Sequence, residues 1–473
     1  MDGIIAFIAD MAGRLSRAVW GAPMALLLMG TGIYLSCRLG WVQVRRFGAV
    51  MRGTLGWLFS QPEGGRGSVT PFQAMATALA GTMGTGNIAG VALAVSLGGP
   101  GAIFWLWVTA IPGMATKFAE VLLAVRYRER ASNGEWAGGP MYYIKNGLGR
   151  RWMPLARCFA LAGMLAALGM GNAVQVSELA ASVQTALELC APAAAADGAR
   201  VSAYVGLFAA LCSAAVLLGG AKRLGTVAGM LVPAAALAYA LACLAVVFTH
   251  LDALPGALAL ILRGAFEPQS VAAGLSLRAC IDCGLRRGVF SNEAGLGSAP
   301  IAHAATSETE PVRQAFYGVF EVFADTMVVC TLTGVTLLVS GVGVGYGSAQ
   351  SAPLCARALG TALGARGGAL VVALGMCLFA LSTLFSWGLY GSRCCEFLLG
   401  ARSVRPYLAV FCAAAFLGAA AGSELAWPLA DALNGLMALP NLLALLALSG
   451  QAARETKEYF RRKKVVDIWP SML

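Results

Sequence analysis

The sequence has little charge for its length. Only 12% of its 473 residues are Asp, Glu, Lys or Arg, whereas 58% are hydrophobic. A soluble globular protein carries roughly 25% charged residues, so this composition excludes that class. The long, evenly apolar stretches also exclude an outer-membrane barrel, whose strands alternate in polarity over about ten residues. We therefore predict an all-α polytopic membrane protein.

The sequence also lacks a cluster that would indicate a metal or cofactor site. It has two histidines, and most of its thirteen cysteines lie within apolar stretches, where they act as small apolar side chains. Cys280 and Cys283 form a C-x-x-C pair and Cys394 and Cys395 are neighbours, but no second pair stands at ligand spacing. We therefore predict no cofactor and leave a metal or redox site as the alternative.

The net charge of +11 comes from short basic clusters between the apolar stretches, without the basic, aromatic-laced patch that nucleic-acid binding requires. These clusters fall at 38–66, 126–157, 222–223, 393–405 and after 453. Basic loops stay in the cytoplasm. The alternation therefore predicts eleven transmembrane helices, with the N-terminus outside and the C-terminus in the cytoplasm. Membrane lipids are predicted partners, and nucleic acids are not.

The N-terminal segment 1–20 is amphipathic, and we expect it to lie at the membrane interface before a first span at 22–37. A signal peptide is the alternative. No small-residue cleavage site follows, however, and the next residues include Arg38, Arg45 and Arg46. We therefore interpret 22–37 as a retained membrane helix.

One apolar stretch, 72–97, contains AGTMGTGNIAG at 80–90, where helix formers should be densest. Glycine, threonine and asparagine weaken a helix there, which predicts a break in mid-membrane. Irregular backbone persists at that depth only where it is buried in protein or lines a polar cavity. Its freed carbonyls can hold a cation and its amides a carboxylate. Close packing between helices that contain small residues is the alternative reading.

A second interruption, FSNEAGLGSAP at 290–300, lies in a later apolar stretch. Paired breaks in the two halves of a chain indicate a transporter site, since half-helix ends of this kind bind substrates and coupling ions.

The ten spans after the first divide into two sets of five, and each set opens with an interrupted helix. An odd number of spans gives the two sets opposite orientations, so the breaks meet near the midplane. We therefore predict a leucine-transporter-like 5+5 inverted repeat with one extra N-terminal helix. Its parts are 1–55 (interfacial segment and extra helix), 56–270 (first repeat, broken at 80–90), 271–450 (second repeat, broken at 288–300) and 451–473 (basic cytoplasmic tail).

Four long motifs follow one another along the chain: GTMGTGNIAGVA, PGAIFWLWVTAIPGMATKFAE, GPMYYI and RRGVFSNEAGLGSAPIAHA. Together they resemble the alanine or glycine:cation symporters, a bacterial family of sodium-coupled amino-acid importers, from about Arg45 to Asn441. The resemblance implies a transporter of the bacterial inner membrane and not an enzyme. Its substrate would be a small neutral amino acid, alanine or glycine, driven by sodium or by protons.

The same resemblance implies that the two breaks clamp a zwitterion. The amides of Gly84, Thr85 and Gly86 would meet the substrate carboxylate. The carbonyls of Thr82 and Phe290 would accept hydrogen bonds from its ammonium group.

Four further polar or bulky residues are implied around the substrate. Ser291 would accept from the ammonium group, and Trp387 would cap the pocket and exclude large side chains. Asn292 either contacts substrate or stitches the break together. Gln175, like Asn172, either lines the pocket or bonds a neighbouring helix.

Two sodium positions are implied. Asn87 would give its side-chain oxygen to an ion beside the substrate carboxylate, because sodium prefers hard oxygen ligands. Ser382 and Thr383 would form a second site with the carbonyls of Ala80 and Met83. The alternative is that these two hydroxyls bond back to their own helix.

Buried ionisable residues in a membrane are functional by default. Glu321 and Asp325 are four residues apart and so predicted to share a helix face. Asp325 either neutralises a cation or pairs with Arg286 or Arg287, of which we favour Arg287 as a pairing residue. His303 is interpreted as a packed helix residue, with a proton relay as the alternative.

Two other classes of protein remain as alternatives. An integral-membrane enzyme needs acid and nucleophile clusters near one interface, and no such cluster stands out. An uncoupled channel or receptor keeps a polar pore but needs no half-helix cation site.

Overall fold

The computed structural model describes residues 2–56, 69–131, 134–272, 274–421 and 423–468. Within these ranges the chain is almost entirely helical, apart from an antiparallel pair of two-residue strands, β1 (Glu129–Arg130) and β2 (Trp136–Ala137). Eight helices in the described ranges are long and apolar enough to cross a membrane, and ten spans result if each bent pair counts as one. The all-helical, multi-pass class is confirmed, and the count of eleven stays a prediction.

The helices of the first half are α1 (Asp2–Val19), α2 (Ala22–Arg38), α3 (Val42–Arg45), α4 (Phe47–Leu55), α5 (Pro71–Thr82), α6 (Val91–Gly98), α7 (Ala102–Arg126), α8 (Pro140–Tyr143), α9 (Met153–Leu168), α10 (Gln175–Cys190), α11 (Pro192–Ala195), α12 (Gly198–Leu217), α13 (Gly220–Thr249) and α14 (Leu254–Phe266). Those of the second half are α15 (Leu277–Asn292), α16 (Ala299–His303), α17 (Pro311–Val322), α18 (Thr331–Val339), α19 (Ala352–Leu399), α20 (Val404–Ala421) and α21 (Ser423–Ile468). The basic loop predicted at 38–66 lies partly outside the described residues, as do the last five residues of the tail.

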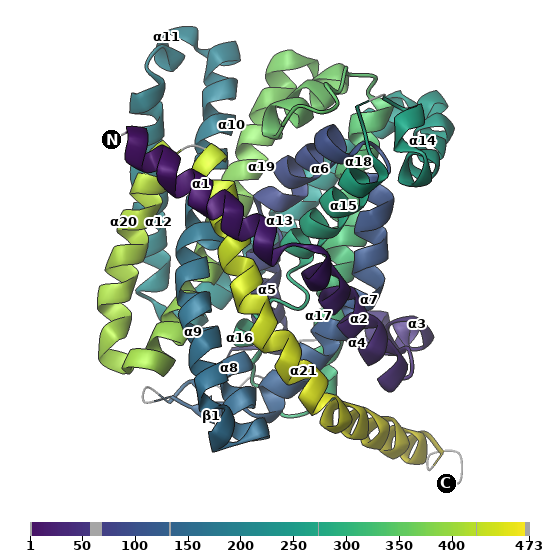
Figure 1. Ribbon diagram of the computed structural model, residues 1–473, viewed down its shortest axis with the longest axis vertical. Coiled ribbons are helices and arrows are strands. Elements are labelled where there is room, and N and C mark those ends of the chain that lie inside the picture. The colour runs from purple at the N-terminus through teal and green to yellow at the C-terminus, as the bar shows by residue number, and fades with distance from the viewer. Residues whose placement is uncertain (1, 57–68, 132–133, 273, 422, 469–473) are drawn as a thin grey trace.

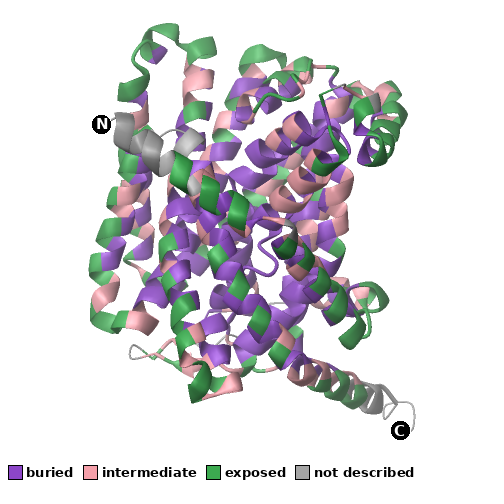
Figure 2. Cartoon of the chain, in the orientation of Figure 1, coloured by how far each residue is buried: buried purple, intermediate pink, exposed green. Residues whose placement is uncertain are grey.

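The core of the bundle contains α5, α7 and α16, and buried residues concentrate there (Figure 2). Thr70 starts α5 with a capping box, because its hydroxyl accepts from the Gln73 amide while the Gln73 side chain accepts from the Thr70 amide. The far ends of the two interrupted helices are joined by a parallel β-bridge between Val69 and Thr306. The segments that carry the breaks are therefore held inside the bundle and against each other.

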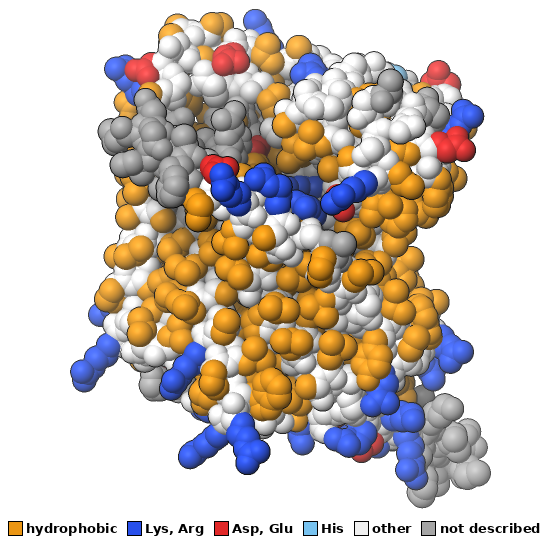
Figure 3. All heavy atoms as spheres, viewed as in Figure 1, with side chains coloured by type: hydrophobic (Ala, Val, Ile, Leu, Met, Phe, Trp, Pro, Cys, Tyr) orange, Lys and Arg blue, Asp and Glu red, His pale blue; other side chains and the backbone are white. Residues whose placement is uncertain are grey.

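The outer helices α12, α13 and α20 expose large apolar side chains such as Leu211 (62%), Met230 (67%) and Leu417 (65%). Hydrophobic side chains cover the middle of the face in Figure 3, lysine and arginine gather along its lower edge, and a second row of them crosses its upper third. Such a band is what a helix bundle presents to lipid, since the hydrocarbon region offers no partner for polar groups.

Helix α1 crosses in front of α21 (Figure 1). The Trp20 Nε1 that follows α1 donates to the Asp431 carbonyl at 2.6 Å. A Cβ added at Gly435 would lie 2.1 Å from Val19, so the end of α1 packs closely on α21. The C-terminal end of α21 projects from the bundle as a continuous helix (Figure 1).

Candidate functional site

The first break separates α5 from α6. Helix α5 ends at Thr82, Met83 has non-helical dihedrals (φ −73°, ψ 86°), and a π-helical segment Gly86–Gly90 leads into α6. The two halves are bent by 48°, and every residue of the break is buried. This break falls within the range 80–90 that the sequence indicates.

Two backbone amides in the first break are bound by side-chain oxygens. The Gly84 amide donates to Asn87 Oδ1 at 3.1 Å, and the Thr85 amide donates to Gln175 Oε1 at 3.1 Å. An amide oxygen thus stands where a carboxylate oxygen is expected to bind. Gln175, from α10, reaches the break, whereas Asn172 donates to the Phe411 carbonyl of α20 at 2.7 Å. Gln175 therefore contacts the first break, whereas Asn172 bonds a neighbouring helix.

The second break is shorter than the predicted interruption at 288–300. Helix α15 continues to Asn292, and the irregular backbone begins at Glu293 in a left-handed conformation (φ 55°). Gly295 (φ 92°) and Gly297 (φ 82°) continue it to α16, and only glycine adopts such dihedrals without strain. Phe290 and Ser291 consequently lie in the last turn of a regular helix and not in unwound backbone.

Asp325 joins the two breaks. Its Oδ1 accepts from Asn87 Nδ2 of the first break at 2.7 Å, and its Oδ2 accepts from Ser291 Oγ beside the second at 2.7 Å. Thr326 Oγ1 also donates to Oδ2 at 2.8 Å, and the Asp325 side chain is fully buried. A carboxyl group, an amide and a hydroxyl therefore converge at one point between half-helix ends.

Arg287 is a pairing residue, but its partner is not Asp325, whose role the sequence left open. Arg287 Nη2 lies 3.1 Å from Asp431 Oδ2 of α21, and its guanidinium lies over the Trp427 ring at 4.3 Å. Arg286 donates to the Trp20 carbonyl instead. Neither arginine therefore pairs with the Asp325 carboxylate.

Glu321 and Asp325 do not share surroundings, although they are four residues apart. A π-helical segment, Phe323–Cys330, interrupts the α-helical register between them. Glu321 contacts Lys117 and His303, whereas Asp325 contacts the residues of the breaks. Four residues are close to one full turn of either kind of helix, so the common face stays a prediction, although the two acids have different partners.

Only one of the two adjacent hydroxyls on α19 reaches the first break. Thr383 Oγ1 donates to the Ala80 carbonyl at 3.0 Å and lies 3.5 Å from the Met83 carbonyl. Ser382 Oγ donates to the Phe379 carbonyl of its own helix at 2.9 Å. Ser382 thus bonds back to its own helix, which is the alternative stated for these two hydroxyls.

Trp387 lies at the second break. Its Nε1 donates to Glu293 Oε1 at 2.9 Å, and a Cβ at Gly171 would fall 2.1 Å from its Cβ. Asn292 bonds Thr326 and the Ala294 amide, which is the stitching alternative. Thr82 Oγ1 bonds the Leu79 carbonyl of its own helix.

Our reading of the sequence missed a buried charged cluster beside the second break. Lys117 Nζ lies 3.3 Å from Glu321 Oε1, and Glu120 and Glu293 are close to the same lysine. Two charged residues at positions 117 and 120 inside an apolar span were the available signal, because such residues rarely occur there without a function.

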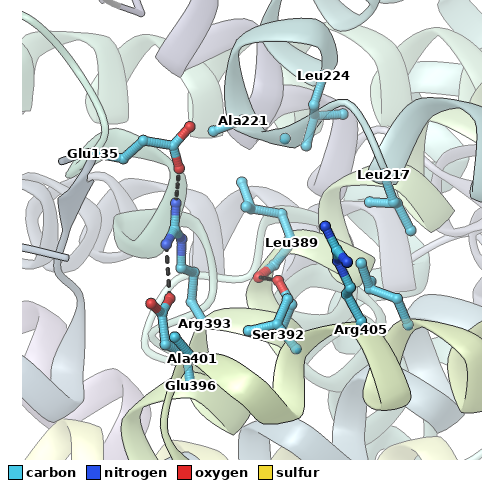
Figure 4. Close-up of a pocket in the computed structure, with 13 residues that line it drawn as sticks. Glu135, Leu217, Ala221, Leu224, Leu389, Ser392, Arg393, Glu396, Ala401 and Arg405 are labelled. Atoms are coloured by element: carbon cyan, nitrogen blue, oxygen red, sulfur yellow. Dashed lines mark hydrogen bonds and ion pairs between the residues drawn. The ribbon is translucent and has the colours of Figure 1, made fainter. Parts of the chain in front are cut away.

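A cavity of about 330 Å³ lies at the end of α19, away from both breaks (Figure 4). Arg393 spans one side of it, paired with Glu135 and, at 2.7 Å, with Glu396. Arg405 points toward the cavity from α20. None of the predicted substrate or sodium residues lines this cavity.

Comparison with known proteins gives consistent relatives over nearly the whole chain. The chain is 44% identical over 459 residues to the sodium/alanine symporter AgcS of Methanococcus maripaludis, covering 96% of this chain and 98% of that one. It is 44% identical to an uncharacterized transporter of Haemophilus influenzae, covering 97% of each chain, and 35% identical to the probable sodium/glutamine symporter GlnT of Bacillus subtilis, covering 98% and 92%.

A solved structure of a substrate-bound, outward-open Na⁺-coupled sialic acid symporter covers 93% of this chain and 86% of its own, at 14% identity and a TM-score of 0.45. That score is too low to establish a common fold. The profile of the sodium:alanine symporter family matches residues 5–468, in agreement with the motifs in the sequence. This protein belongs to the sodium:alanine symporter family.

Proposed function

We propose that this protein imports a small neutral amino acid, alanine or glycine, together with sodium by alternating access, and that it has no enzymatic activity. Family membership supports sodium-coupled amino-acid symport. The observation that carries the proposal is Asp325, whose carboxylate bonds Asn87 of the first break and Ser291 beside the second. A buried acid shared by two half-helix ends is suited to a cation whose binding organises both.

The proposed sodium ligands fall into two groups. Near the substrate, the Asn87 side-chain oxygen and the Asp325 carboxylate are hard oxygen ligands of the kind sodium prefers. The second group consists of the Ala80 and Met83 carbonyls with Thr383, whose hydroxyl is within 3.5 Å of both. Ser382 belongs to this second group only if its hydroxyl leaves the Phe379 carbonyl.

The proposed substrate site uses the amides of Gly84, Thr85 and Gly86 for the carboxylate. Gln175 Oε1 accepts from the Thr85 amide, so a substrate carboxylate would take its place and release the Gln175 side chain. The Thr85 backbone amide would thus exchange one oxygen acceptor for another and stay hydrogen-bonded during binding.

The ammonium group would be held by the Thr82 and Phe290 carbonyls and Ser291, with Asn292 and Trp387 at the border of the site. A Cβ added at Gly86 would lie 3.2 Å from the Phe290 ring, which indicates little free space beside the first break. Tight packing of this kind favours a substrate with a side chain of one carbon or none.

The proposed orientation has the N-terminus outside and the C-terminus in the cytoplasm of a bacterial inner membrane. It is supported by the basic side chains along the lower edge in Figure 3, the end at which α21 leaves the bundle. The proposed architecture is two inverted five-helix repeats, 56–270 and 271–450, after one extra helix. The two breaks then move as one bundle against the rest of the protein.

The test is uptake of labelled alanine into proteoliposomes. We expect uptake to require an inward sodium gradient, and Asn87→Ala to lose the sodium dependence of alanine binding because it removes an ion ligand. Equal uptake without sodium, or with a proton gradient alone, contradicts sodium symport. Counterflow of label against a gradient distinguishes a carrier from a channel.

A further inference from the structure

Five buried titratable side chains surround the second break. They are Lys117 and Glu120 of α7, Glu293 of the break, His303 of α16 and Glu321 of α17, and each residue is 0% exposed. With three carboxyl groups and one lysine, this cluster has an excess of acids. Its charge balance decides which groups are ionised.

Lys117 and Glu321 neutralise each other, and His303 is neutral. Lys117 Nζ lies 3.3 Å from Glu321 Oε1, and His303 Nε2 lies 3.0 Å from Glu321 Oε2. The Gln314 side-chain nitrogen, which can only donate, lies 2.9 Å from His303 Nδ1. Nδ1 is therefore the acceptor and the single ring proton is on Nε2, where it donates to Glu321.

Glu120 and Glu293 remain without a cation in hydrogen-bond contact. Both oxygens of Glu293 have neutral donors, namely Trp387 Nε1 at 2.9 Å and Ser298 Oγ. Glu120 differs, because its Oε1 accepts from Asn441 Nδ2 at 2.6 Å and from the Gly295 amide at 3.1 Å, whereas its buried Oε2 has no hydrogen-bond partner.

No cluster of metal-ligating side chains surrounds these acids within the described ranges. No group of three or more His, Cys, Asp or Glu that could hold a metal occurs in the part of the chain that the structure describes. A buried carboxylate without a counter-charge takes up a proton instead of staying ionised. We propose that Glu120 is a proton-binding site, with the proton on Oε2. Oε2 gains a proton there without losing an existing hydrogen bond. Glu293 differs, because a proton on its Oε2 would reverse the hydrogen bond with Ser298 Oγ, whose hydroxyl can accept as well as donate.

This site is connected to the moving part of a transporter. Glu120 Oε1 and the Asn441 side chain bind the Gly295 amide and carbonyl respectively, so α7, α21 and the second break meet there. Tyr143 of α8 donates to Asn441 Oδ1 and is a further titratable group facing the site. If the break moves against α21, Glu120 loses its donors, and its proton affinity changes with the conformation.

The experiment measures alanine binding to the purified protein at saturating sodium across about pH 5.5 to 8.5. This readout rests on the proposed function. A bound proton linked to substrate changes the apparent Kd of the wild type by up to about tenfold per pH unit where Glu120 titrates. Glu120→Gln mimics the protonated acid, and we expect its Kd to change less than about twofold over the same range.

Glu178→Gln is the matched control. Glu178 is also a buried acid that accepts a hydrogen bond from a neutral donor, Trp427 Nε1 at 2.9 Å, but it belongs to α10 and bonds α21 rather than the second break. We expect this variant to keep the pH dependence of the wild type. The proposal is overturned if the Kd of the wild type for alanine does not depend on pH. It is also overturned if Glu120→Gln keeps the pH dependence of the wild type. A Glu293→Gln variant that alone removes the dependence overturns it as well.

A second measurement needs no substrate. If Glu120 is protonated in the folded state and ionised in the unfolded state, the melting temperature of the wild type falls as the pH rises through its titration. We expect Glu120→Gln to lack this decrease, and an identical decrease in both proteins overturns the site. If the wild type binds no alanine, the proposed function fails while this pH series still tests the proton.

Discussion

The two breaks differ in how their polar groups are satisfied. In the first, neutral amides and hydroxyls do so: Asn87, Gln175 and Thr383 bond its backbone. In the second, carboxyl groups take part as well: Glu120 accepts from the Gly295 amide and Glu293 bonds Trp387 and Ser298, beside the neutral amides of Asn292 and Asn441. A neutral side chain gives up its hydrogen bond to an incoming ligand at small cost, whereas separating buried ionisable groups is expensive.

The two breaks are therefore expected to have different roles. The first can exchange Gln175 Oε1 for a carboxylate and accept an ion at its carbonyls. The second is held in one geometry by left-handed backbone at Glu293, Gly295 and Gly297 and by its acids. Changes at the second break should therefore act on folding, and changes at the first on ligand affinity.

The largest effect is expected from Lys117→Met. It leaves Glu321 and the nearby acids buried without their cation, which destabilises the fold by about 3–5 kcal/mol. The control is Lys145→Met, because Lys145 pairs with Glu129 at 2.9 Å at a partly exposed site and such pairs contribute about 0–1 kcal/mol. Thermal unfolding in detergent measures both, and the double variant Lys117→Met, Glu321→Gln should recover part of the loss. Similar losses for the two lysines would contradict the contrast.

Replacing one glycine in each break by alanine distinguishes an effect on folding from an effect on binding. At Gly297 (φ 82°) a Cβ would lie 2.5 Å from Pro140 and 2.9 Å from Phe159, and we expect a loss of about 2–4 kcal/mol from overpacking and left-handed strain. At Gly84 a Cβ would lie 2.6 Å from Thr383 Oγ1, a hydroxyl that can rotate away.

Gly84→Ala should therefore keep nearly the wild-type melting temperature and raise the sodium concentration for half-maximal uptake by about tenfold. Melting curves and uptake titrations on the same preparations make the comparison. If Gly84→Ala unfolds the protein while Gly297→Ala is merely less active, the two breaks have the reverse roles.

The smallest effect concerns the two hydroxyls of α19. Thr383→Val removes the donor to the Ala80 carbonyl, a loss of about 0.5–1.5 kcal/mol that weakens the apparent sodium affinity by up to about tenfold. Ser382→Ala is the control, since its hydroxyl bonds its own helix, and should change that affinity less than about twofold. Sodium titration of uptake gives both values, and equal effects would place Ser382 among the ligands as well.

Much of the site follows from residue type. The first break is where glycine, threonine and asparagine replace helix formers, and Gln175, Asn87 and Thr383 do meet there. The residue types alone did not indicate which acid pairs with Arg287. The pairing depended on which turn of α15 faces α21, where Arg287 meets Asp431.

The sequence by itself determined the membrane class and the approximate positions of the interruptions. These follow from local chemistry, because hydrocarbon demands that each backbone group be paired within its own segment or within the protein. Only the tertiary structure decided which buried charge faces which. Lys117, Glu120, Glu293 and Glu321 come from three separate parts of the chain, and the free energy of a buried charge depends on the distance to its partners and not on its place in the sequence.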